Sequence, residues 1–137
     1  MRSAIRLVRL VQIVFLVSIV LSAVIGERLG RKLPPENTLF HALSFGAIII
    51  VGSTIVVRRT LIAPAEDLLK KRPDDMLTVA RWRSGYLFIY AMCEALGLLG
   101  LVLRLLGFAL VQVWGFYLGG FLLLLLFSPR PPHAEFR

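Results

Sequence analysis

The chain has few of the residues that build catalytic and metal sites. Its 137 residues include one cysteine and two histidines, which excludes an intrachain disulfide and a cluster of Cys and His ligands. It also lacks the G-x-S-x-G, H-E-x-x-H and phosphate-loop patterns of hydrolases, metalloproteases and nucleotide-binding proteins. We therefore expect no enzyme activity, no catalytic residues, no metal and no cofactor. The one cysteine, Cys93, is expected to be a small apolar side chain inside a helix.

Acidic residues are also scarce, since 8 Asp and Glu stand against 16 Lys and Arg, for a net charge of +8. In a soluble protein this excess would suggest nucleic acid as a partner. Here the basic residues flank long apolar blocks instead of forming a patch of their own. The predicted partner is therefore the lipid bilayer, and no nucleic acid is expected.

The dominant feature of the sequence is its apolar residues, which make up 58% of the chain and come in blocks. Four blocks approach or exceed the roughly 17–25 residues that cross a bilayer as a helix. We predict an all-α membrane protein, a four-helix transmembrane bundle that forms a single integral domain over residues 1–137. The predicted spans cover residues 7–26, 38–57, 84–103 and 105–127. The last two are so close that Gly107 must make a tight turn near the membrane surface.

The longest polar segment, residues 58–83, is predicted to be a helical cytoplasmic loop. Pro64 suits the first position of a short helix, with acidic residues after it and basic residues at its end. Asp74 and Asp75 are expected to cap a second helix that continues unbroken into the third span. Trp82, between two arginines, is placed as an interfacial anchor. Residues 128–137 are rich in proline and are predicted to form a flexible tail.

The first apolar block, residues 10–25, has an alternative interpretation as a secretory signal peptide, because three arginines precede it. Its length exceeds the roughly 7–15 apolar residues of such signals, and no small-residue cleavage site follows it. The block is therefore predicted to be the first membrane span.

The distribution of positive charge predicts the orientation. Twelve Lys and Arg residues flank the spans on the side of the two termini and the 58–83 loop, against four on the other side. Positive residues favour the cytoplasmic side. We expect both termini in the cytoplasm, with the protein in the bacterial inner membrane.

Glu94, the single carboxylate inside a predicted span, is the main candidate for a functional residue. A charged carboxylate at the bilayer centre costs roughly 2.5–3.5 kcal/mol, so Glu94 must be neutral or have a hydrogen-bond donor. Tyr90 lies one turn away on the same helix face. The candidate partners on other helices are Ser18, Ser22, Ser44, Ser53, Gln112 and Tyr117. Glu94 is interpreted either as a proton or cation carrier or as a residue that links two helices by a hydrogen bond.

Small residues repeat along the predicted helices and predict close helix packing. Those expected at helix contacts are Ser18, Ser22, Gly26, Gly46, Gly97, Gly115 and Gly119, the last two in a G-x-x-x-G pattern. Gln112 is expected to form an interhelical hydrogen bond. A weaker hypothesis makes His41 a haem or quinone ligand, which would require a symmetric dimer because a single membrane histidine cannot form a bis-imidazole site.

Two stretches, "ARWRSGYLFIYAMCEALGLLGLVLRLLG" and "FYLGGFLLLLLFSPRPP", resemble a pattern in small bacterial four-helix membrane proteins of unknown function. The resemblance covers roughly the second half of the chain and implies fold and location but no activity. Rotor-ring proteolipids and small multidrug resistance transporters share only the presence of a membrane glutamate, and no functional residue carries over from them. We expect a structural or accessory membrane subunit, with possible homo-oligomer or larger-complex partners. The alternative is a proton-coupled small transporter that uses Glu94.

Overall fold

The computed structural model describes residues 2–30 and 37–129, and every regular element in these ranges is a helix. The elements in chain order are α1 (Arg2–Leu29), α2 (Asn37–Val57), the π-helical turn η1 (Arg58–Ile62), α3 (Ala63–Lys71), α4 (Met76–Leu105) and α5 (Leu110–Leu126). The prediction of an all-α chain is confirmed for these residues. The part of the predicted tail from residue 130 onward lies outside them.

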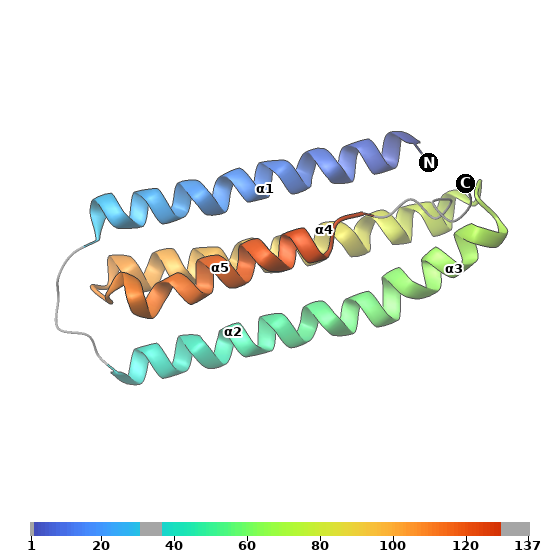
Figure 1. Cartoon of the computed structure of the whole chain (residues 1–137). Coiled ribbons are helices and arrows are strands. Elements are labelled where there is room, and N and C mark those ends of the chain that lie inside the picture. Colours follow the sequence, from blue (N-terminus) through green and yellow to red (C-terminus); the bar gives the residue numbers. More distant parts are fainter. Residues whose placement is uncertain (1, 31–36, 130–137) are drawn as a thin grey trace.

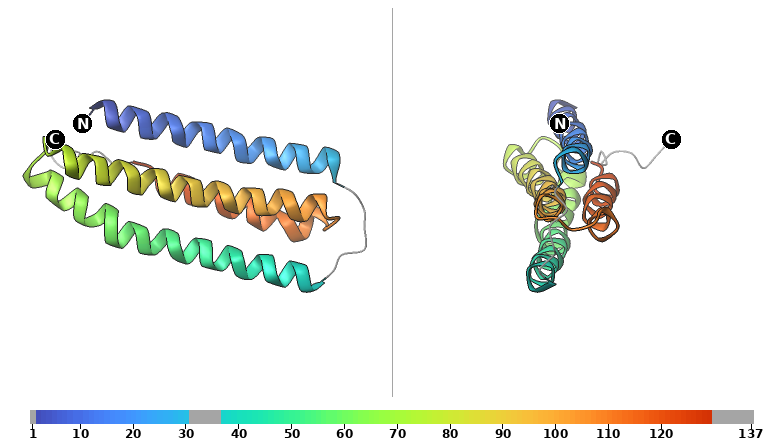
Figure 2. Two further views of the ribbon diagram at one scale, coloured as in Figure 1. Left: turned by 180° about the vertical axis from the view of Figure 1, so that it is seen from behind. Right: turned by 90° about the vertical axis from the view of Figure 1, so that its left-hand side faces the viewer.

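Helix α4 lies at the centre of the molecule (Figures 1 and 2). Helices α1, α2 and α5 each pack against it, and α1 also packs against α5. The end-on view in Figure 2 places α2 on the opposite side of α4 from α1. Within Asn37–Val57, Thr54 is the one buried residue. The arrangement is therefore a compact group of α1, α4 and α5, with α2 attached along one side of α4.

Three helical segments are long and apolar enough to cross a membrane: Ser3–Leu29, the continuous segment Asn37–Lys71, and Met76–Leu105. Helix α5 is apolar but has 17 residues, about 25 Å at 1.5 Å per residue. The predicted fourth span, 105–127, began too early, because residues 105 and 106 still belong to α4 and its cap. Gly107 makes the turn with φ 100°, a backbone conformation that favours glycine.

The second predicted span, 38–57, does not end where the polar segment begins. The helix continues through η1 into α3, and Figure 1 shows one long, gently bent rod. The π-helical turn ends just before Pro64. A proline ring clashes with the carbonyl four residues earlier in a regular helix, and a wider turn relieves such a clash. The expected short helix at Pro64 is therefore present, but no break precedes it.

Helix α4 begins well before the predicted third span, 84–103. Asp75 caps it: one carboxylate oxygen accepts a 3.3 Å hydrogen bond from the Leu77 amide, and the other accepts one from the Thr78 hydroxyl. The helix then runs without a break from Met76 to Leu105, as the sequence predicted. Helix α1 likewise extends beyond the predicted 7–26 at both ends.

Candidate functional site

Glu94 lies near the middle of α4 and faces α1. The Ser18 hydroxyl donates a 2.5 Å hydrogen bond to Glu94 Oε1. The other carboxylate oxygen, Oε2, is buried and has no hydrogen-bond partner among the described residues. A buried polar atom without a hydrogen-bond partner is unfavourable. Glu94 therefore links α4 to α1 through its Oε1 and Ser18.

Two other candidate partners of Glu94, Tyr90 and Gln112, make their hydrogen bonds elsewhere. The Tyr90 hydroxyl donates to the backbone carbonyl of Phe127 at 3.1 Å instead of reaching back to Glu94. Gln112 is exposed at the start of α5, where its Oε1 accepts a 3.2 Å hydrogen bond from the Ala109 amide. Gln112 thus caps its own helix and makes no interhelical bond to any residue that the structure describes. The structure brings Ser18 to Glu94 and separates Tyr90 and Gln112 from it.

The C-terminal end of α5 is held by two side chains from neighbouring helices. Gln12 of α1 is buried, and its Nε2 donates a 2.7 Å hydrogen bond to the Leu124 carbonyl. The Tyr90 hydroxyl of α4 likewise donates a hydrogen bond to the Phe127 carbonyl. The last carbonyls of a helix have no partner within it, and lipid offers no water to replace one. Gln12 was not among the predicted site residues, although an isolated glutamine inside the first apolar block is a usable signal.

A second group of polar contacts lies beyond the apolar part of α4. Glu66 of α3 accepts hydrogen bonds from Trp82 Nε1 at 3.4 Å and from the Tyr86 hydroxyl at 3.0 Å. The Trp82 and Tyr86 rings lie 4.9 Å apart, and Trp82 is fully buried. Trp82, predicted as an interfacial anchor, therefore packs inside the protein and fixes α3 against α4.

At the opposite end of the molecule, Arg104 joins α4 to the α4–α5 turn and to α1. It donates a 3.0 Å hydrogen bond to the Phe108 carbonyl, and it lies 3.5 Å from the exposed carboxylate of Glu27. Arg104 Nε and the Tyr117 hydroxyl are buried without hydrogen-bond partners among the described residues. Because Glu27 is exposed to solvent, its ion pair with Arg104 positions the two side chains but adds little to stability.

The small residues predicted at helix contacts differ in what surrounds them. Gly26 faces the Tyr117 hydroxyl, Gly97 faces Ile19, and Ser22 is buried, so these three lie at contacts between helices. Gly46 and Gly115 face open space, since a Cβ atom added at either position would have no neighbouring atom within 4 Å. Gly119 has one neighbour, Leu96, at 3.4 Å.

Among the glycines of α5, the tightest contact with α4 is at Gly120, which was not among the predicted contact residues. A Cβ atom at Gly120 would lie 2.8 Å from the backbone oxygen of Cys93. The G-x-x-x-G pattern at 115 and 119 indicated the correct helix, but Gly120, one position further along, is the glycine in tight contact. The side chain of Cys93 itself is buried.

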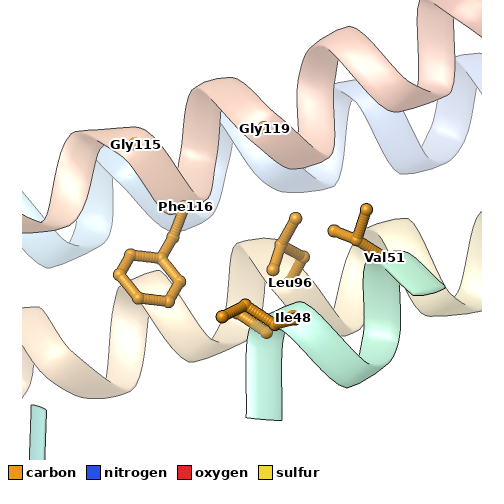
Figure 3. A pocket seen from close by; sticks show the side chains of 7 residues that line it. Ile48, Val51, Leu96, Gly115, Phe116 and Gly119 are labelled. Carbon is orange, nitrogen blue, oxygen red and sulfur yellow. The ribbon is translucent and has the colours of Figure 1, made fainter. Parts of the chain in front are cut away.

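An apolar groove of about 350 Å³ lies between α2 and α5, with α4 as its floor. Figure 3 shows the side chains of Ile48 and Val51 on α2, that of Phe116 on α5, and that of Leu96 on α4 between them. Gly115 and Gly119 leave the α5 wall without side chains over part of its length. The open G-x-x-x-G pair thus widens this groove.

His41 is exposed, and its Nδ1 lies 2.6 Å from the Asn37 carbonyl one turn earlier. Across residues 2–30 and 37–129, no three His, Cys, Asp or Glu residues gather in a group able to hold a metal ion.

Comparison with known proteins found no relative of this chain. No protein family, curated protein or solved structure matches the chain.

Proposed function

We propose that the chain is a non-enzymatic integral protein of the bacterial inner membrane that serves as a structural or accessory subunit. The observation that carries this proposal is the exposure of α2, which packs chiefly on α4 and buries one residue of its own. We define the α2 outer face as Phe45, Ile49, Gly52 and Val56, all exposed and spaced to share one side of a helix. This face docks a transmembrane helix of a partner subunit or of a second copy.

The proposed membrane arrangement has α5 crossing the bilayer beside α1, α2 and α4, which completes a four-helix transmembrane bundle. Its 17 residues reach the lower limit of roughly 17 for a membrane helix. The bonds from Gln12 and Tyr90 to its final carbonyls support this, because they supply donors where lipid supplies none. Both termini are cytoplasmic, on the side of the basic 58–83 segment. A reporter fused to the C-terminus tests this: activity on the cytoplasmic side is expected, and activity on the other side contradicts it.

The docking proposal is tested by a photo-crosslinking residue placed at Ile49 in native membranes. The expected product is an adduct of one discrete mass that contains a second protein chain. Gly52→Leu should abolish it, since a bulky side chain on the α2 outer face keeps a helix away. Gly46→Leu is the matched control, because Gly46 is equally open but lies outside this face. Adducts to lipid alone would refute the docking role.

A proton-coupled transporter is the second candidate, favoured by Glu94 Oε2, which is buried and has no hydrogen-bond partner within residues 2–30 and 37–129. The two functions differ in their response to Glu94→Gln. An amide keeps the acceptor for Ser18 but cannot bind and release a proton. Proton flux into liposomes that falls to background in Glu94→Gln, with the fold intact, supports the transporter. Equal flux in both proteins excludes it.

A further inference from the structure

A guanidinium group, that of Arg58, lies beyond the end of the groove between α2 and α5. Arg58 follows the groove residues Ala47 and Val51 by 11 and 7 positions, spacings that return to nearly the same side of a helix. Its position on this side is independently fixed by Phe127 at the end of α5, because Arg58 Cζ lies 5.1 Å from the centre of that ring. Seven residues place Arg58 about 10 Å beyond Val51.

The Arg58 guanidinium carries the positive charge and the N–H donors that bind an anion. Among residues 2–30 and 37–129, no carboxylate forms an ion pair with it, and its side chain is exposed. A guanidinium stacked on an aromatic ring leaves the N–H groups at its edge available for bidentate bonding to a phosphate. Arg58 is also the first residue of the π-helical turn, and such turns recur at functional sites.

The chemistry around the groove favours a lipid as its occupant. The groove is lined by apolar side chains and two glycines, which suits a hydrocarbon chain. Arg58 beyond its end is a cation, which suits an anionic head group on the same molecule.

We propose that the α2–α5 groove and Arg58 form a binding site for one anionic phospholipid, with an acyl chain in the groove and the phosphate on the Arg58 guanidinium. The site is separate from the α2 outer face, so it does not depend on the proposed docking function.

The test is native mass spectrometry of the full chain with phosphatidylglycerol or phosphatidylcholine at equal concentration. The wild-type protein should retain phosphatidylglycerol preferentially. Arg58→Gln should reduce this preference about five-fold, the change expected for one well-placed arginine. Arg72→Gln, at the far end of α3, is the matched charge control and should change it little. Equal losses in both variants would show diffuse charge attraction and overturn the site.

The groove is tested by Gly115→Leu, since Gly115 has room for a side chain. This variant should lose retention of both lipids, whereas Gly46→Leu should not. Phosphatidylglycerol with a photoreactive acyl chain tests the wild-type protein directly, independently of how any variant folds. Labelling at Leu96 or Phe116 is the expected result. Labelling confined to other helix faces, or unchanged retention in a folded Gly115→Leu protein, would refute the proposal.

Discussion

The Ser18 hydroxyl and Glu94 Oε1 lie 2.5 Å apart and join α1 to α4 across 76 positions of sequence. Interhelical hydrogen bonds in membranes stabilise by about 0.6 kcal/mol on average and by up to about 1.7 kcal/mol. We expect Ser18→Ala to lower the free energy of unfolding in micelles by an amount in this range. Glu94→Gln should have a smaller effect, because its amide oxygen still accepts the bond.

A double-mutant cycle between these two positions isolates the bond. The coupling between Ser18→Ala and Glu94→Ala should account for most of the Ser18→Ala effect. Strictly additive losses would mean that the two side chains do not interact.

Two glycines of α5 should respond oppositely to alanine. At Gly120 a Cβ would lie 2.8 Å from the Cys93 backbone oxygen, so Gly120→Ala must push α5 away from α4 at a cost of about 1–3 kcal/mol. At Gly115 nothing lies within 4 Å, and replacing a mid-helix glycine gains roughly 0.5–1 kcal/mol. Thermal unfolding of both variants in the same detergent measures the difference. Equal effects would contradict the close contact at Gly120.

The α4–α5 turn depends on Gly107, whose φ is 100°. A side chain in this region strains the backbone, so Gly107→Ala should destabilise the chain by about 1–2 kcal/mol. The neighbouring Leu106→Ala is a suitable control, because Leu106 has φ −77° and is exposed. A Gly107→Ala protein as stable as this control would show that the turn tolerates an L side chain.

The cap of α4 should depend on pH. The hydrogen bond from the Thr78 hydroxyl lowers the pKa of Asp75 below its ordinary value of 3.8. Because the folded pKa lies below the unfolded one, the stabilisation is complete above pH 3.8 and is lost as the pH falls through the folded pKa. The chemical shift of the Leu77 amide, followed by NMR in micelles, should therefore titrate below pH 3.8.

Thr78→Val tests the cause of this shift. The variant keeps the shape of the side chain but loses the hydroxyl, so the pKa of Asp75 should rise toward 3.8. A midpoint that does not move would assign the shift to another group.

Features that depend on neighbours in sequence were predictable. Apolar runs longer than a bilayer requires predicted the helices, Asp75 predicted the start of α4, and Gly107 predicted the tight turn before α5. Each of these follows from local chemistry: residue length and composition, a capping carboxylate, or a permitted φ. The structure of the polar segment after α2 was harder to predict. Pro64 predicted the start of a new helix, whereas the π-helical turn allows one helix to continue past this proline.

Contacts between helices were decided by the tertiary structure alone. Several side chains on other helices were equally plausible partners for Glu94, and the packing of α1 against α4 selected Ser18. It likewise placed Gly120 rather than Gly115 at the tight contact and left α2 open on one side. The physical reason is that a membrane helix is apolar all round, so its hydrophobic periodicity does not say which face meets a neighbour. The sequence by itself determined the helices, the cap that begins α4 and the turn that follows it, and only the three-dimensional packing determined which helix faces meet.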